Sequence, residues 1–206
     1  MSETHTEETT EEDAPPVIVF ENQGSEGADL RKIGLYGPID EESCSSVVYL
    51  LLSLAEKGKK VDETGVETVE PIELFLSTAG GAASDMFAVY DVMRHLKEKV
   101  PIETFGIGRV MSAGVLLLAA GTKGGRRIGK HCRVMLHSVA SGYTGELYSL
   151  ENELEEVQHT QNQYIKALAA ETDMTEKYIK KILDKKINVY FTAEEAVELG
   201  IVDEVV

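Results

Sequence analysis

The chain has 206 residues, 43% of them hydrophobic, and a formal net charge of −16, which is enough for one domain with a substantial core. It carries no basic patch of the kind that binds nucleic acid. No apolar run approaches the ~20 residues of a membrane span, and the N-terminus lacks the basic and apolar regions of a signal peptide. We therefore expect neither nucleic-acid nor membrane partners.

The N-terminal segment differs from the rest of the chain in composition. Residues 1–30 hold nine acidic residues and no Lys or Arg, which leaves a net charge of −7 on the remainder. Residues 1–16 are rich in Glu and Thr and end in Pro15-Pro16, so we predict a disordered acidic arm over 1–16 and a single domain over 17–206. A short strand is predicted over 17–20 and a loop over 22–29.

The first part of the domain alternates strand-like and helical patterns. Strands are predicted over residues 33–36, 72–76, 100–107 and 132–137, helices over 40–56, 84–97 and 112–120, and loops or turns over 58–70, 79–82 and 121–129. Asp40 is the predicted N-cap of the first helix, and Ser84 or Asp85 that of the second. Strands that alternate with helices in this way predict an α/β fold.

A long amphipathic helix is predicted over about 146–170. Its stripe has spacings of three and four and consists of Leu147, Leu150, Leu154, Val157, Tyr164 and Leu168, and Gln161 fills the slot between Val157 and Tyr164. The stripe alone leaves open whether the helix packs on its own domain or projects toward another subunit. Two further helices are predicted over 175–184 and 193–199, with Gly200 as the C-terminal cap.

Two cysteines, Cys44 and Cys132, lie far apart in the sequence and in apolar patterns. Their spacing is not that of a metal site. We expect both to be free, buried thiols of a protein in a reducing, cytoplasmic environment.

One serine and one histidine are the candidates for chemistry. Ser112 lies between a strand-like run and an apolar helix, and His137 ends a later strand. Serine becomes a good nucleophile only when a base takes its proton, and the free N–H groups of a helix N-terminus suit an oxyanion. Alone, each has a plainer interpretation, as a helix cap or a surface histidine. Position 110 is Val, which disfavours the Gly-x-Ser-x-Gly turn of α/β-hydrolases.

Four motifs in fixed order carry a resemblance to a known family. They are Ser77-Thr-Ala-Gly-Gly81, Gly108-Arg-Val-Met-Ser112-Ala-Gly, Arg133-Val-Met-Leu-His137 and Phe191-Thr-Ala-Glu-Glu-Ala-Val-Glu-Leu-Gly-Ile-Val-Asp203. Their order and spacing resemble the proteolytic subunit of the Clp protease (ClpP), from about residue 33 to 206. The resemblance implies a crotonase/ClpP-like α/β spiral of β-β-α units with a protruding handle helix at about 146–170.

The same resemblance implies an ATP-dependent Clp protease subunit that acts as a serine endopeptidase. Ser112 takes the position of the nucleophile and His137 that of the general base. The N–H groups of Gly81 and Ala113 take the positions of the oxyanion hole. The resemblance implies a reaction that needs no metal and no organic cofactor. ATP would be used only by a partner unfoldase.

The third triad position departs from the family's usual pattern. An acid is usual there, whereas this chain has Asn188; Asp184 lies one helical turn earlier and aligns with another family position. An Asn side chain can accept the imidazole N–H and orient the ring, but it cannot offset the charge of the imidazolium. The replacement therefore predicts reduced activity.

The implied partners are copies of the chain and an unfoldase. The resemblance implies two stacked seven-membered rings, a tetradecamer, that enclose unfolded polypeptide substrates, together with an AAA+ unfoldase or a ClpP paralogue. At the face that receives an unfoldase, Phe75 keeps an aromatic residue. Glu73 stands there where Tyr is common, and His95 where an aromatic residue is common.

Two alternatives remain at this point. One is a ring-forming subunit of low or no activity, which Asn188 favours and the retained Ser112 and His137 oppose. The other is an acyl-CoA hydratase or isomerase of the same superfamily. Those enzymes generally use carboxylates as acid and base, and neither 112–114 nor 132–138 contains one, so this alternative is disfavoured.

Overall fold

The computed structural model describes residues 30–61, 64–65, 67–142 and 144–206. The predicted arm over 1–16, the strand over 17–20 and the loop over 22–29 lie outside the described residues. None of the helices in the described part of the chain is long and apolar enough to cross a membrane.

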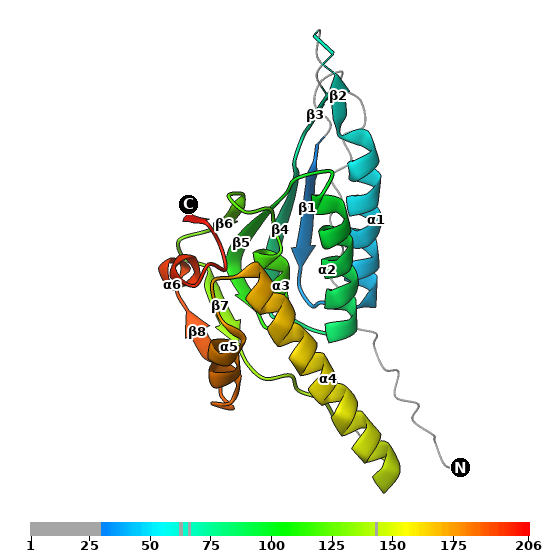
Figure 1. The fold of residues 1–206 in the computed structure, drawn as a ribbon, viewed down its shortest axis with the longest axis vertical. Helices are drawn as coiled ribbons and strands as arrows, with labels where there is room; N and C mark the ends of the chain where they lie inside the picture. Colours follow the sequence, from blue (N-terminus) through cyan, green and yellow to red (C-terminus); the bar gives the residue numbers. More distant parts are fainter. Residues whose placement is uncertain (1–29, 62–63, 66, 143) are drawn as a thin grey trace, which may run out of the picture.

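A mixed sheet forms the centre of the fold (Figure 1). Its strands are β1 (Lys32–Tyr36), β4 (Ile72–Thr78), β5 (Ile102–Met111), β6 (Arg126–Ile128), β7 (Arg133–Leu136), β8 (Val189–Phe191) and β9 (Glu204–Val205). The order is β1-β4-β5-β6-β9, and β7 pairs with both β5 and β8. Only β7 and β8 pair antiparallel among these described strands. Helical crossovers join the parallel strands, as parallel pairing requires.

Strand β5 pairs with different neighbours along its length. Its first half lies between β4 and β6, whereas Arg109 to Met111 pair with β7. The register to β4 shifts between Leu76 and Thr78. The carboxyl ends of β4, β5 and β7 thereby come together at one edge of the sheet.

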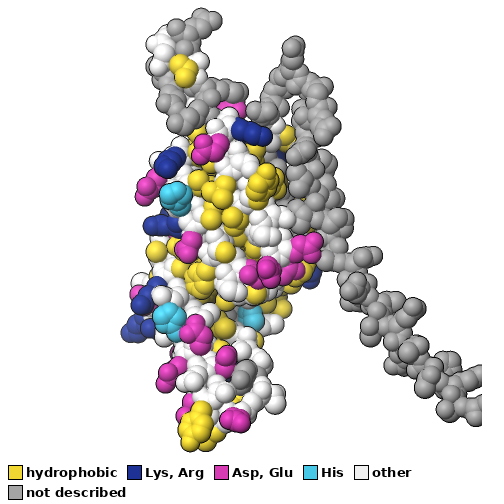
Figure 2. Space-filling model, turned by 90° about the vertical axis from the view of Figure 1, so that its right-hand side faces the viewer, with side chains coloured by type: hydrophobic (Ala, Val, Ile, Leu, Met, Phe, Trp, Pro, Cys, Tyr) yellow, Lys and Arg dark blue, Asp and Glu magenta, His cyan; other side chains and the backbone are white. Residues whose placement is uncertain are grey.

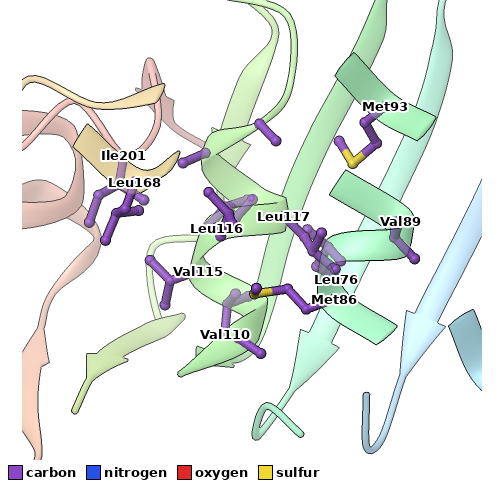
Figure 3. Packing of buried hydrophobic residues seen from close by; sticks show 14 of the residues in the cluster. Leu76, Met86, Val89, Met93, Val110, Val115, Leu116, Leu117, Leu168 and Ile201 are labelled. Atoms are coloured by element: carbon purple, nitrogen blue, oxygen red, sulfur yellow. The ribbon is translucent and has the colours of Figure 1, made fainter. Parts of the chain in front are cut away.

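Six helices are described: α1 (Glu41–Lys57), α2 (Ala83–Lys97), α3 (Ala113–Ala119), α4 (Leu147–Glu171), α5 (Glu176–Leu183) and α6 (Ala193–Glu198). Helices α1 and α2 lie side by side along one face of the sheet (Figure 1). Every residue of α3 is buried, as expected for a helix that is hydrophobic all round. Figure 3 shows Leu116 and Leu117 of α3 in the middle of the core, with α2 residues on one side and Leu168 and Ile201 on the other.

The predicted cap of α1 is confirmed and that of α2 is wrong. Asp40 accepts a hydrogen bond from the Ser43 N–H at 2.9 Å, and the Ser43 side chain accepts one from the Asp40 N–H. The bond from the Ser43 N–H to the carboxylate is the largest of the causes that lower the pKa of Asp40. Helix α2 instead follows Ala82, which offers no side-chain cap. Ser84 and Asp85 lie in its first turn, where the Asp85 carboxylate still interacts favourably with the helix dipole.

The sequence missed most of the short strands. The predicted loop over 58–70 contains a two-stranded ribbon of β2 (Lys59–Val61) and β3 (Glu67–Val69). The predicted turn over 121–129 contains β6, β5 continues to Met111 rather than ending at 107, and neither β8 nor β9 was predicted. These segments are too short or too charged to show an alternating apolar pattern, and their pairing partners are distant in sequence.

Arg126 explains why a charged segment lies inside the fold. Its buried guanidinium donates to Asp203 and to the carbonyl oxygens of Glu171 and Gly200, the last two at 2.8 Å. Burial acts to raise the pKa of Asp203, but hydrogen bonds from Arg126 outweigh it and lower that pKa. The pair anchors β9 and the end of α4 to β6.

Helix α4 has two differently exposed halves. Leu147 and Leu154 are 65% and 58% exposed, whereas Tyr164 and Leu168 are buried. In Figure 1 the N-terminal half of α4 projects beyond the sheet. Figure 2 shows this lower end of the molecule with acidic side chains and a hydrophobic tip. The predicted protruding helix is therefore confirmed.

Two smaller predictions also hold. Cys44 and Cys132 are free and buried, and burial raises the pKa of each thiol to about 11. Gly200 follows the C-cap of α6 with φ 66°, the left-handed conformation that glycine adopts easily after a helix.

Candidate active site

Ser112 is the single residue between strand β5 and helix α3. Its backbone has φ 54° and ψ −122°, a conformation that a non-glycine residue adopts at an energetic cost and that is frequent at functional sites. The side chain makes no capping hydrogen bond to α3. Ser112 therefore occupies the N-cap position of α3 but does not cap the helix through its side chain.

Backbone hydrogen bonds hold the Ser112 turn in place. The N–H of Ser112 donates to the Met135 carbonyl at 2.8 Å, which ties the turn to β7. The carbonyl of Ser112 accepts two bonds, from the Val115 N–H at 3.0 Å and from the Tyr164 hydroxyl at 2.9 Å. The strained conformation is thus fixed from both sides.

The sheet brings His137 to the serine. Met111 pairs with Met135 in the parallel β5–β7 ladder, so the chain leaves both strands at the same edge. The Ser112 Oγ and the His137 Nε2 lie 2.8 Å apart. This is hydrogen-bonding distance, and it lets a neutral imidazole take the hydroxyl proton.

Gly80 lies against the serine. A Cβ at this position would approach the Ser112 Cβ to 2.6 Å, and the backbone φ is +98°. A side chain at position 80 would therefore displace Ser112 as well as strain the turn.

The N–H of Gly81 points away from the neighbouring segment at Ile39. Ile39 donates to the Gly80 carbonyl at 3.0 Å and accepts from the Ala82 N–H at 2.8 Å, so in this parallel bridge the N–H of Gly81 points to the other side. Within the described residues no acceptor is recorded for the N–H of Gly81 or of Ala113. Ala113 is in the first turn of α3, where such donors are free.

A pocket with a volume of about 450 Å³ lies over these groups. Its lining is Ala79, Gly80, Gly81, Ala82, Ala83, Met86, Ser112, Ala113, His137, Val139, Ala140 and Tyr164. Four of the five predicted site residues, Ser112, His137, Gly81 and Ala113, thus face one cavity. It can hold a carbonyl group beside both the hydroxyl and the two N–H groups.

Asn188 lies apart from this arrangement. Leu136 pairs with Val189 in the antiparallel β7–β8 ladder, and the same register continued by one residue puts Asn188 opposite His137. The Asn188 side chain is exposed, and no hydrogen bond between it and the His137 ring is recorded among the described residues. Asp184 is the exposed C-cap of α5.

Two residues that contact the site were not predicted as part of it. Tyr164 donates to the Ser112 carbonyl, and the Gln161 Oε1 accepts from the Val139 N–H at 3.2 Å. Both lie on α4 and were assigned only to its stripe. The polar Gln161 in an apolar slot was a signal of such a contact, whereas nothing in the sequence distinguished Tyr164 from a core aromatic residue.

The sheet face that carries Glu73 is charged. Glu73 forms ion pairs with Lys32 at 3.2 Å and with Arg127 at 3.5 Å. Phe75 packs against Phe105, with ring centroids 5.4 Å apart. The exposed His95 lies near the end of α2. In the described residues, no cluster of three or more His, Cys, Asp or Glu could hold a metal ion.

A strained serine beside a histidine and free backbone N–H groups is an arrangement typical of serine hydrolases. Comparison with known families extends this: the family model described as Clp protease matches residues 24–206. The chain therefore belongs to the Clp protease family. Membership confirms the resemblance and the α/β fold class predicted from the motifs, and it supports a ClpP-type peptidase that forms ring oligomers in general.

Proposed function

We propose that this protein is a serine endopeptidase that cleaves unfolded polypeptides inside a chamber of stacked rings. The observation that carries the proposal is the 2.8 Å contact between the Ser112 Oγ and the His137 Nε2. It occurs at a strained strand-to-helix turn, beside a cavity, in a chain of the Clp protease family.

In the first half of the proposed reaction, His137 takes the Ser112 proton while Oγ attacks the peptide carbonyl. The oxyanion that forms accepts hydrogen bonds from the N–H groups of Gly81 and Ala113. One such donor contributes about 3–4 kcal/mol to the transition state in a related case. The C–N bond then breaks, and the imidazolium gives its proton to the leaving amine.

In the second half, water enters where the amine left. His137 takes a proton from that water, hydroxide adds to the acyl carbon, and Ser112 leaves with the proton returned to its oxygen. The same two N–H groups hold the second oxyanion. Metal and organic cofactors have no role in these steps.

Asn188 is the proposed orienting residue for His137. Its position opposite His137 supports this role, which requires its amide oxygen to turn toward the Nδ1–H of the imidazole. A neutral amide orients the ring without balancing the charge that His137 gains. We therefore propose a slow peptidase.

The proposed assembly is a pair of seven-membered rings in the cytoplasm, stacked through α4. The exposed Leu147, Leu150 and Leu154 on its projecting half support this contact, because burying them between subunits removes apolar surface from water. An AAA+ unfoldase would feed the chamber. The Glu73 ion pairs weaken the fit of an apolar docking loop, so a paralogue in mixed rings is the other proposed partner.

A second candidate function is a ring-forming subunit of low or no activity. The observation that favours it is the exposed Asn188 side chain without a recorded hydrogen bond to His137. In that case the chain would contribute walls to a chamber whose active sites belong to a paralogue.

A fluorophosphonate probe separates the two candidates. The assembled wild-type protein should be labelled at one site, and Ser112→Ala should lose both labelling and hydrolysis of short fluorogenic peptides. Ser141→Ala, at an exposed position, is the matched control and should react as wild type does. If the assembled wild type shows neither labelling nor turnover, the peptidase proposal fails and the ring-forming subunit without activity remains as the function.

A further inference from the structure

Tyr164 touches the nucleophile from a distant part of the chain. It lies on α4, 52 residues after Ser112, and its hydroxyl donates to the Ser112 carbonyl at 2.9 Å. The ring is only 6% exposed and lines the pocket over Ser112. The Tyr164 hydroxyl therefore binds the backbone of the strained residue itself.

Gln161 makes a matching contact to the segment of the base. It precedes Tyr164 by three residues, so both side chains project from the same face of α4. The Gln161 Oε1 accepts from the N–H of Val139, two residues beyond His137. One helix face thus holds one hydrogen bond to each of the two segments that carry the candidate catalytic groups.

The geometry points to Tyr164 and Gln161 as positioning residues that hold Ser112 and His137 in mutual alignment. The inference deepens the proposed function and rests on it: α4 aligns the nucleophile and base as well as carrying the surface proposed for ring stacking.

Strain explains why the nucleophile needs this support. Ser112 has φ 54°, and such conformations persist only where the surroundings over-determine them. The Tyr164 hydroxyl is the contact from outside the local turn that binds the Ser112 carbonyl, in addition to the Val115 N–H of α3 itself. Burial raises the pKa of Tyr164, so the phenol stays protonated and remains a donor at physiological pH.

The plainer interpretation is that Tyr164 only fills the core. The ring would then suffice, and phenylalanine would serve equally well. Positioning predicts a different result, because removal of the hydroxyl leaves the packing intact and frees the Ser112 carbonyl. Tyr164→Phe therefore distinguishes the two, with Tyr178→Phe on α5 as the matched control at a 43% exposed tyrosine.

We expect Tyr164→Phe to lower the second-order rate of fluorophosphonate labelling and the kcat for a small peptide about tenfold, the size of one lost hydrogen bond. KM should change little, since the ring that lines the pocket remains. Tyr178→Phe should match wild type. Wild-type rates in Tyr164→Phe would overturn the positioning role of Tyr164.

The role of Gln161 is tested with the same pair of variant and control. Gln161→Met keeps length and removes the acceptor, whereas Gln163→Met makes the same change at an exposed position of α4. Only the first should lower the labelling rate, by about three- to tenfold. Equal rates in the two variants would overturn the role of Gln161.

Hydrogen exchange on the assembled full chain decides the inference without any activity. In Tyr164→Phe, exchange in residues 109–117 should rise about tenfold, and in Gln161→Met the same should occur in 135–141. Unchanged exchange in these segments would refute the positioning role. If wild type is not labelled by the probe, the peptidase proposal fails, and the exchange data alone still accept or reject the contacts as positioning devices.

Discussion

The two sides of His137 are built differently. Toward Ser112 the imidazole meets a turn held by the β5–β7 ladder and by bonds to Met135 and Tyr164. On the other side, the register of β7 and β8 puts His137 opposite Asn188, an exposed residue that precedes the three-residue strand β8. The position of Ser112 depends on backbone pairing within the sheet, whereas the orienting role proposed for Asn188 depends on one exposed side chain.

This difference has a physical origin in the packing. Buried and partly buried residues alternate over 102–107 of β5, and its buried Val110 pairs with the buried Val134 of β7, so this ladder cannot slip without moving core side chains. Asn188 follows the turn after α5, where Lys186 has φ 54° and nearly every residue is exposed. The fold therefore fixes Ser112 and His137 more firmly than it fixes the Asn188 side chain.

The largest expected effect comes from removing the His137 side chain, which lies between the Ser112 and Asn188 sides. His137→Ala should lower kcat for peptide hydrolysis by at least about 10³-fold, because loss of the base in a serine protease removes most of the catalysis. His131→Ala, at an exposed histidine, should leave kcat unchanged. Steady-state kinetics on a fluorogenic peptide would test this, and equal kcat in the two variants would show that His137 is not the base.

Gly80→Ala tests how tightly the nucleophile side is built. The added methyl group meets the Ser112 Cβ, and the backbone has positive φ. We expect a loss of about 1–3 kcal/mol in the free energy of unfolding and a fall of roughly 10²-fold in the labelling rate. Gly142→Ala, which meets open space, is the control. Chemical denaturation and probe kinetics measure both, and a wild-type labelling rate would mean that position 80 tolerates a side chain.

Asn188→Asp tests the side of His137 that faces Asn188. A carboxylate there should orient His137 and stabilise the imidazolium, so peptide hydrolysis near neutral pH should accelerate. The gain should stay well below the ~10⁴-fold loss known for the reverse change elsewhere. Asp184→Asn should have no effect. A loss of activity in Asp184→Asn, with none gained in Asn188→Asp, would transfer the orienting role to Asp184.

Leu154→Glu should have the smallest effect on the domain itself. The side chain is 58% exposed, so the Tm of the isolated fold should shift by no more than a few degrees. A buried charge at a ring contact is costly, so native mass spectrometry should show double rings split into single ones. Persistence of double rings would locate the stacking contact elsewhere. If the effect of Asn188→Asp on peptide hydrolysis differs between single and double rings, ring stacking influences how Asn188 is placed relative to His137.

Much of this protein follows from local patterns in the sequence. The alternation of strands and helices, the Asp40 cap and the long α4 all depend on neighbouring residues. The resemblance of the four motifs to the Clp protease family pointed to Ser112, His137, Gly81 and Ala113. Local patterns report helix caps and amphipathic faces well because their hydrogen bonds and spacing lie within a few residues.

Other features were decided only by the tertiary structure. The short strands β6, β8 and β9 exist because distant segments supply their partners, and Arg126 is buried because Asp203 and two carbonyl groups surround it. The strain at Ser112, the exposure of Asn188 and the contacts of Tyr164 and Gln161 likewise depend on residues far apart in the sequence. Such long-range contacts leave no periodic pattern, so only the packed fold reveals them.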